Sequence, residues 1–539
     1  MSTFDYIIIG AGSAGCVLAN RLSEDPSVHV LLIEAGKKDS KMEIQIPAAF
    51  SKLFHSEFDW GYQSTPSPFS GDRRHFLPRG KVLGGCSSVN AMIYIRGNAL
   101  DYDHWFDLGN QGWSYEEMLP FFKKGEGHVD GEHPFHGGNG LLTVSHLRDP
   151  MPTSHAFISA GEELAIPINP DFNGNYQEGL GFYQVTQRKG KRCSASDAFL
   201  KPIRSRPNLK ILTRKTVTRI LIEEGTAVGV EYREKHHVQQ VRCTREVLVS
   251  AGAYNSPQLL MLSGIGPADH LKSHGIEVTL DLPGVGQHLQ DHYIVPMVFH
   301  NRDKRTLENA ERLPSLLNYL FWTEGPLSSN VAEAGGFIKT RKELPAPDIQ
   351  FHFAPGYFFN HGLDRPKSGH GFSIGPTLLQ PESIGSIQLQ SADPLDAPLI
   401  DHNYLSDARD VETLKAGMKV AYEIAHSEAM SNFFDGYYLP NKHLESDREL
   451  DRHIRTQGQT LYHPTGTCKM GSDEMAVVDE QLRVHGVQHL RIVDASIMPQ
   501  IVRGNTNAPT IAIAEKAAEM ITSHAKQTET RPATMKTSG

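Results

Sequence analysis

The apolar positions near the start of the chain predict two buried strands joined by a helix. The run Tyr6 to Ile9 is typical of a strand covered on both faces, and "VHVLLIEAG", which ends at Gly36, has the same character. Between them, residues 16–22 carry small and apolar side chains at helical spacing, and Pro26 marks the way out of the helix. We therefore expect a βαβ unit at the beginning of the chain.

Later stretches differ in pattern. After residue 205, "NLKILTRKTVTRILIEEG" and "HHVQQVRCTREVLVSAGAYNSPQLL" alternate as strands do, and the second ends in a helix that starts near Ser256. Residues 300–455 mix aromatic clusters and the strand-like "SIGSIQLQS" with charged helices. The last 80 residues hold "LRIVDASIMP", an amphipathic helix near 512–521 and a polar tail. The pattern indicates an α/β fold, or α+β overall, with a separate sheet-and-helix domain.

The motif "GAGSAG" lies between the first strand and its helix and predicts a dinucleotide site. Gly10 allows the turn, Gly12 lets a pyrophosphate approach the backbone, and Gly15 lets helix and strand pack closely. Glu34 ends the second strand, with 18 residues between it and Gly15, where a carboxylate binds a ribose hydroxyl. The alternative is a turn that merely tolerates glycine.

The spread of further motifs favours FAD over NAD. A Rossmann-type NAD enzyme usually completes its nucleotide domain in one stretch, whereas motifs recur here near residues 80, 250 and 495. A large cofactor held by several distant segments fits this spread better.

We therefore expect a Rossmann-like FAD-binding domain built from three parts and a substrate domain between them. The expected division is 1–150, 205–300 and 456–523 for the FAD-binding domain, 151–204 for a substrate-domain segment and connection, 301–455 for the substrate domain, and 524–539 for a disordered tail.

Composition narrows the class of protein. Hydrophobic residues make up 39% and charged residues 21% of the 539-residue chain, which is ordinary for a globular protein. The net charge of −9 includes no basic block, so nucleic acid is not an expected partner. Five scattered cysteines form no Cys-x-x-Cys pair, and neither a signal peptide nor a transmembrane run is visible. We expect a cytoplasmic protein, loosely membrane-associated at most, without a metal.

Four ordered motifs resemble the glucose-methanol-choline oxidoreductase family of flavoproteins. "GKVLGGCSSVNAMIYIRG" resembles the first family signature, with Cys86 as a departure, and "GAYNSPQLLMLSGIG" matches the second. "HPTGTCKMG" and "VDASIMPQIVRGNTNAPT" are similar to the C-terminal active-site segments. The resemblance extends from Phe4 to about Ile521 and implies FAD-dependent oxidation of an alcohol to the aldehyde.

The resemblance also implies residue roles. His463 matches the histidine beside the reactive N5 of the flavin, and Asn505 matches the second active-site position. A neutral imidazole can take the hydroxyl proton while hydride passes to N5, and Asn505 can bond the developing carbonyl oxygen. A structural role in a loop is the alternative for His463. The residues expected to contact FAD are Gly10, Gly12, Ser13, Gly15, Glu34, Ala35, Val82, Gly84, Gly85, Asn90, Ala91, Val217, Ala251, Asp494, Ala495 and Asn507.

Several points stay open at this level. Some relatives attach FAD through a histidine at the position of Val89, so we expect a non-covalent cofactor here. His288 and His292 are four residues apart, but the further ligands that a metal needs are not identifiable. The electron acceptor is a quinone, a carrier protein or oxygen. The same fold also hosts choline-type dehydrogenases, oxidases, lyases and decarboxylases.

The aromatic segments of the substrate domain predict the kind of alcohol. "LNYLFW" brings Phe321 and Trp322, and residues 351–359 add five further aromatic side chains. The second segment is broken at Pro355, so we expect part of it to line a pocket. Trp60 offers a ring for a quaternary ammonium, but Glu333 is the nearest acidic partner in sequence and has no assigned place. An uncharged primary alcohol with an apolar or aromatic body is therefore the expected substrate.

Overall fold

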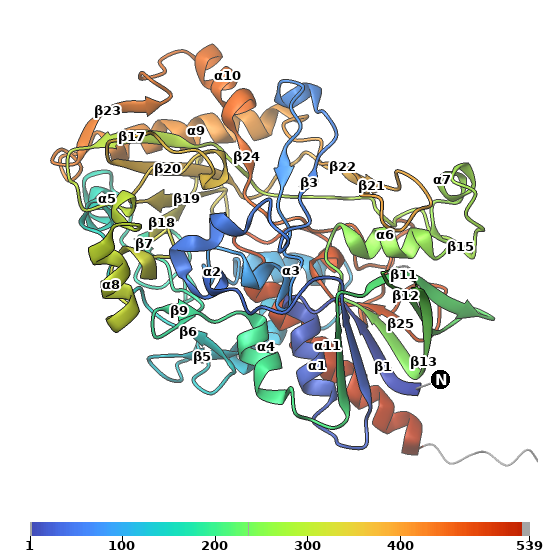
Figure 1. The fold of residues 1–539 in the computed structure, drawn as a ribbon. Coiled ribbons are helices and arrows are strands. Elements are labelled where there is room, and N and C mark those ends of the chain that lie inside the picture. The colour runs from blue at the N-terminus through green and yellow to red at the C-terminus, as the bar shows by residue number, and fades with distance from the viewer. Residues whose placement is uncertain (1–2, 236, 531–539) are drawn as a thin grey trace, which may run out of the picture.

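The computed structural model describes residues 3–235 and 237–530, which form two large sheets side by side (Figure 1). The first sheet has the order β10-β2-β1-β13-β12-β11, and β25 also pairs with β13. Its strands are β1 (Thr3–Ile9), β2 (Val30–Glu34), β10 (Leu209–Thr213), β11 (Thr216–Glu223), β12 (Thr226–Glu234), β13 (His237–Val249) and β25 (Leu490–Ile492). β10, β2, β1, β13 and β25 pair in parallel, and β12 and β11 continue the sheet antiparallel.

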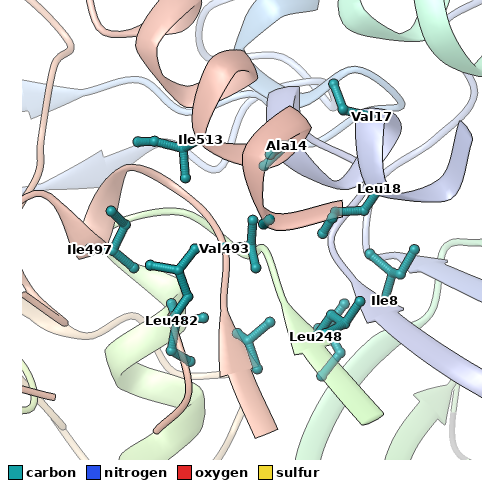
Figure 2. Close-up of a cluster of buried hydrophobic side chains, with 14 of the residues drawn as sticks. Ile8, Ala14, Val17, Leu18, Leu248, Leu482, Val493, Ile497 and Ile513 are labelled. Atoms are coloured by element: carbon teal, nitrogen blue, oxygen red, sulfur yellow. The ribbon is translucent and has the colours of Figure 1, made fainter. Parts of the chain in front are cut away.

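The predicted βαβ unit is confirmed. β1 and β2 pair in parallel with Tyr6 opposite Val30, and α1 (Ser13–Leu22) connects them. Side chains of α1 and of the C-terminal helix α11 (Asn507–Thr530) pack together on the central strands, and this covering explains why β2 is apolar at four consecutive positions. Figure 2 shows this cluster, which includes Ile8, Ala14, Val17, Leu18, Leu248, Leu482, Val493, Ile497 and Ile513.

The second sheet is antiparallel, with the order β23-β17-β20-β19-β18-β7, and β16 pairs with both β20 and β24. Every residue of β18, β19 and β20 is buried, and α5 and α9 pack against this sheet (Figure 1). The strands are β7 (Gly179–Phe182), β16 (Tyr293–Ile294), β17 (Met297–Asn301), β18 (Ala334–Ile338), β19 (Ile349–Ala354), β20 (Gly371–Leu378), β23 (Phe434–Leu439) and β24 (Gln459–Thr460).

The other elements surround the two sheets. The remaining helices are α2 (Met42–Gln45), α3 (Ala99–Asp107), α4 (Tyr115–Gly125), α5 (Pro152–Glu163), α6 (Asn255–Leu262), α7 (Ala268–Ser273), α8 (Leu313–Trp322), α9 (Ala408–Ala425) and α10 (Asp447–Gln457). Small strand pairs are β3 (Tyr62–Gln63) with β4 (Phe76–Leu77), β5 (Glu126–His128) with β6 (Leu142–Val144), β8 (Gln187–Arg188) with β9 (Lys191–Arg192), β14 (Ile265–Gly266) with β15 (Leu280–Asp281), and β21 (Ser386–Gln388) with β22 (Leu399–Asp401).

The boundaries agree with several expectations. The helix expected near Ser256 is α6, and β19 ends at Ala354, before the predicted break at Pro355. The helix expected near 512–521 lies within α11, which continues past 523 to Thr530, so residues 524–530 of the expected tail belong to this helix. Residues 531–539 of that tail lie outside the described residues. The domain division stays a prediction. Within the described residues, no helix is both long and apolar enough to cross a bilayer.

Candidate active site

A cavity of about 660 Å³ is lined by residues from both sheets and extends from the glycine-rich turn to His463. The predicted site residues on its wall are Gly10, Gly12, Ser13, Glu34, Ala35, Gly85, Asn90, Ala91, Val217, Ala251, His463, Asp494, Ala495, Asn505 and Asn507. These residues come from widely separated parts of the sequence. The fold thus brings most of the predicted cofactor contacts and the predicted catalytic pair to one cavity.

The glycines of the turn have different tasks. Gly10 has φ of +93°, and a Cβ there would lie 2.4 Å from the Ser250 carbonyl oxygen. A Cβ on Gly15 would lie 1.9 Å from the carbonyl oxygen of Gly10, so Gly15 serves helix packing and does not line the cavity. Gly12 lines the cavity, and a Cβ there would meet only Ser250, at 4.0 Å. Gly12 therefore leaves space in the cavity beside the first turn of α1.

Glu34 is held in place by two backbone donors at the end of β2. Its carboxylate accepts hydrogen bonds from the N–H groups of Ala11 at 2.8 Å and Gly36 at 2.7 Å. Burial raises the pKa of this carboxyl to about 7, against the lowering effect of these two bonds. The carboxyl group keeps further lone pairs for a ligand hydroxyl in the cavity.

The segment around Gly85 lines the cavity next to Gly12. A Cβ on Gly85 would lie 2.7 Å from the Cα of Gly12, so the two backbones are in close contact. Gly84 donates its N–H to the Ala11 carbonyl oxygen at 2.7 Å, and Val82 packs in a small buried cluster. Neither Gly84 nor Val82 lines the cavity, so both lie behind the backbone that does.

At the other end of the cavity, His463 belongs to a chain of hydrogen bonds. Its Nδ1 lies 2.8 Å from Nδ1 of His292, and Nε2 of His292 lies 3.1 Å from the carbonyl oxygen of Leu379. Its backbone N–H donates to Asp291 at 2.7 Å. His463 and His292 are both buried.

This chain determines where the protons lie on both rings. A carbonyl oxygen only accepts, so Nε2 of His292 must carry its proton and, in the neutral ring, Nδ1 is an acceptor. Nδ1 of His463 must then be the donor in the bond between the two rings. Nε2 of His463 is consequently unprotonated, and its lone pair is the available acceptor.

Asn505 faces that lone pair. Its side-chain Nδ2 lies 3.2 Å from Nε2 of His463, and its Oδ1 accepts a bond from Nε2 of Gln350 at 3.2 Å. Gln350 is fully buried and lies in β19. The arrangement places a proton acceptor and a hydrogen-bond donor next to each other on the cavity wall.

The surroundings keep the histidines neutral. Burial, followed by the influence of His292, His352 and Arg79, holds the pKa of His463 well below its usual value. Burial likewise lowers the pKa of His292 to about 4 and that of His352 to about 3. The unprotonated form of His463 therefore prevails throughout the neutral pH range.

Aromatic rings cover the cavity wall next to His463. Phe54 lies 6.1 Å from Tyr462 and 5.9 Å from Phe50, and Phe50 lies 6.2 Å from Phe358, measured between ring centroids. All four residues line the cavity. Together these rings form an apolar surface that begins at Tyr462, the residue before His463.

The aromatic segments singled out from the sequence contribute only in part. Phe321 and Trp322 of the first segment are exposed on α8 and do not line the cavity. Phe351 and Phe353 alternate into the buried core of the second sheet, as the two-residue period of a strand requires. His352 on the opposite face of β19 lines the cavity, and so does Phe358, which follows the break at Pro355.

Sequence reasoning missed other residues of the site. From the sequence, His292 is a candidate only as a metal ligand with His288, whereas in the structure His292 bonds His463 and His288 bonds the carbonyl oxygen of Pro499, each at 2.8 Å. Phe50 and Phe54 lie in a short 3₁₀ segment, η1 (Pro47–Leu53), and just after it, and carry no periodic signal. The partner of His463 is 171 residues away in sequence, and only the fold brings it near.

Comparison with known proteins adds a family. Models of the GMC oxidoreductase family match residues 4–294 and 381–514. An alcohol dehydrogenase [acceptor] of Pseudomonas putida is 47% identical over 96% of this chain and 95% of its own length. The mitochondrial choline dehydrogenase of Mus musculus is 43% identical over 97% of this chain and 90% of its own length.

The fold is shared with solved structures as well. A formate oxidase variant of Aspergillus oryzae RIB40, studied for its FAD modification, superposes with a TM-score of 0.91. It is 29% identical, and the match covers 98% of this chain and 99% of that protein.

Proposed function

Because the chain belongs to the GMC oxidoreductase family, we propose that it oxidises an uncharged primary alcohol to the aldehyde with His463 as the base. Membership of the family makes it an FAD-dependent enzyme that acts on CH–OH donors. The observation that carries the finer proposal is the unprotonated Nε2 of His463, which faces Asn505 in the cavity.

The cavity has the features that FAD requires. Gly12 and Gly85 would let a pyrophosphate approach the backbone, and the Glu34 carboxylate would accept a hydrogen bond from a ribose hydroxyl. Of the residues that line the cavity, Val217 would meet the adenine, and Asn90, Ala91, Asp494, Ala495 and Asn507 would hold the flavin half. When bound, FAD supplies the oxidant, which takes a hydride from the carbon that bears the hydroxyl.

The two polar residues divide the work on the alcohol oxygen. Nε2 of His463 accepts the hydroxyl proton, and Asn505 donates a hydrogen bond to the same oxygen as it becomes a carbonyl. The burial that keeps His463 neutral also makes it a weak base. We therefore expect the proton to move together with C–H cleavage and not before it.

The wall favours an uncharged substrate. The carboxylates that line the cavity are Glu34, Asp396 and Asp494, and the first and last belong to the proposed cofactor contacts. Glu333, the acidic candidate for a choline site, is buried away from the cavity and accepts bonds from Met151, Ser154 and Ser329. Asp396 lies in a loop, and its backbone oxygen accepts a hydrogen bond from Nε2 of Gln258 in α6 at 2.8 Å.

The aromatic ring considered for a quaternary ammonium already has a cation. Nζ of Lys81 lies 4.1 Å from the ring centroid of Trp60, and Trp60 stacks on Tyr62 at 5.6 Å. An ammonium substrate would have to compete with Lys81 for this ring.

Steady-state kinetics with chosen alcohols tests the substrate class. We expect kcat/KM for benzyl alcohol and medium-chain 1-alkanols to exceed that for choline. Phe54→Ala should lower kcat/KM for these apolar alcohols about tenfold, as one lost aromatic wall contact implies. Phe76→Ala is the matched control, because Phe76 packs 6.0 Å from Phe54 without lining the cavity. A clear preference for choline overturns the proposed substrate.

For the second substrate, we propose an acceptor other than oxygen, in line with the Pseudomonas putida relative. A quinone or a carrier protein would serve this purpose. Oxygen uptake compared with reduction of an artificial dye separates a dehydrogenase from an oxidase. Anaerobic bleaching of the flavin by alcohol separates both from a lyase or decarboxylase.

A further inference from the structure

Helix α8 (Leu313–Trp322) shows its apolar side chains to solvent. The exposed fractions are 73% for Leu320, 68% for Leu313 and Phe321, and 62% for Trp322, with Leu316 and Leu317 also exposed. Tyr319 is the buried residue of the helix, and its hydroxyl donates to the carbonyl oxygen of Gly190 at 3.1 Å. Figure 1 shows α8 at the edge of the molecule.

This exposure reverses the usual pattern of a surface helix. Such a helix normally turns its apolar stripe to the core and its charges to water. The ten residues of α8 include no charged side chain, and leucines at 313, 316, 317 and 320 follow helical spacing along the outer face. Contiguous exposed apolar surface of this kind marks an interaction site.

The charges at the rim of α8 are mainly basic. Arg312 precedes the helix, Lys52 and Arg365 reach Glu311 at 2.9 and 3.7 Å, and Arg148 reaches Glu324 at 2.9 Å. The exposed Lys189 and Lys191 flank Gly190, which accepts the Tyr319 bond. Six basic side chains thus lie next to the helix or at its two ends, and three of them pair with the flanking acidic residues Glu311 and Glu324, although the whole chain carries a net charge of −9.

The shape of this surface argues against a protein partner of ordinary size. The six exposed side chains form a ridge along one helix about 15 Å long. A stable interface usually takes about 20–30 residues from each side. A short apolar ridge with aromatic residues at one end and a basic rim is typical of a helix that lies in a lipid headgroup region.

We propose that α8 docks the enzyme on an anionic lipid surface. The apolar side chains enter the headgroup and acyl boundary, and the basic rim meets the lipid phosphates. No membrane span is involved. The proposal does not depend on the identity of the alcohol.

The position of α8 gives this docking a use. Tyr319 and Leu327 pack with Ile46 and Ala48, at the start of the segment that carries Phe50 to the cavity wall. The aromatic wall of the cavity and the lipid-facing helix are therefore held by neighbouring residues. A substrate or acceptor dissolved in lipid would be near the site that uses it.

Vesicle flotation of the full-length FAD-loaded enzyme tests the proposal. The vesicles contain equal parts of phosphatidylcholine and phosphatidylglycerol, with pure phosphatidylcholine in parallel. We expect the wild type to float with the anionic vesicles, and added salt to weaken binding. The triple variant Leu320→Ser/Phe321→Ser/Trp322→Ser should lose about tenfold or more of the partition coefficient.

Matched controls separate docking from unfolding. Val129→Ser removes an apolar side chain that is 54% exposed elsewhere on the surface, and it should bind as the wild type does. All variants should keep FAD and reduce a water-soluble dye with a water-soluble alcohol within about twofold of the wild type. Trp322 fluorescence, obtained as the difference from Trp322→Phe, should shift to the blue with vesicles.

Three results would overturn the proposal. One is a wild type that stays with the soluble fraction in the presence of anionic vesicles. Another is a triple variant that floats as well as Val129→Ser. The third is a dimer, or a complex with another protein, that covers α8 in place of lipid, seen as an α8-dependent rise in mass by sedimentation without vesicle binding.

Discussion

Nδ1 of His463 lies 2.8 Å from Nδ1 of His292, and this contact makes the proton positions of the two rings depend on each other. The Leu379 carbonyl oxygen fixes the proton of His292, and His292 in turn fixes that of His463. His292 is thus a positioning residue in this account, because it prepares the lone pair that receives the substrate proton.

Substitution of His292 tests this dependence. In His292→Leu the acceptor for Nδ1–H of His463 is lost, and we expect flavin reduction to slow by about 10–100-fold, the effect of one lost buried hydrogen bond. In His292→Asn the side-chain oxygen replaces the acceptor, and most of the rate should return. Stopped-flow reduction over a pH series measures both variants. A leucine variant as fast as the wild type would show that His292 has no such role.

Two glycines of the first turn separate packing from cofactor approach. Gly15→Ala should destabilise the protein even without FAD, because its Cβ would lie 1.9 Å from the Gly10 carbonyl oxygen. Gly12→Ala should leave the apoprotein stable, since its Cβ meets only an atom 4.0 Å away, but weaken FAD binding where the pyrophosphate approaches. Thermal unfolding of apoproteins and FAD titration measure the contrast. Equal melting temperatures of the two apoproteins would contradict it.

The buried histidines predict loss of stability in mild acid. Their folded pKa values are depressed, so each contributes stability above about pH 6.5 that is lost as pH falls toward the folded value. Each group can contribute a slope of up to about 1.4 kcal/mol per pH unit. The pKa is lowered to about 4 for His292 and His361, to about 3 for His75 and His352, and well below the usual value for His402 and His463.

Groups whose folded pKa is raised act in the opposite direction, among them His136, with a pKa of about 9, and buried carboxyls such as Glu34. Glu34, with its pKa raised to about 7, favours the folded state more as pH falls below that value. We expect the six histidines with lowered pKa values to outweigh these groups, so the melting temperature of the apoprotein should fall between about pH 7 and about pH 5.5. His75→Gln should flatten this dependence, whereas the exposed His29→Gln should not. A melting temperature that is constant or rises toward acid would contradict the prediction.

The link between FAD and protein should be non-covalent. Val89 lines the cavity and has no nucleophilic atom, and Cys86 is the thiol on the same wall. Acid precipitation of the holoenzyme should therefore leave a yellow supernatant. A yellow pellet would mean a covalent link, and Cys86→Ser would then show whether this thiol forms it.

The sequence carried enough information for the local elements and the order of the motifs. The βαβ unit could be predicted from the run Tyr6 to Ile9, the glycine turn and Glu34, because each of these signals depends only on residues close to it in the sequence. The two-residue period of β19 was interrupted at Pro355, which placed Phe358 in a loop at the cavity.

Contacts between distant segments could not be predicted in the same way. His292 directly precedes β16, and His463 follows shortly after β24. Because these two strands pair in the second sheet, the two histidines meet. The sequence shows that α8 is rich in apolar and aromatic residues, but their exposure depends on which face the fold leaves uncovered.

The most direct test of the account is anaerobic flavin reduction in His463→Ala. The variant should bind FAD as the wild type does, since the nucleotide end of the cavity is unchanged, and its reduction rate with a good alcohol substrate should fall by about 10²–10⁴-fold, the usual loss for a general base. Asn505→Ala should slow the same step less, because it removes one neutral hydrogen bond and leaves the proton acceptor. A His463→Ala enzyme that holds FAD and is reduced at most of the wild-type rate would contradict the central claim.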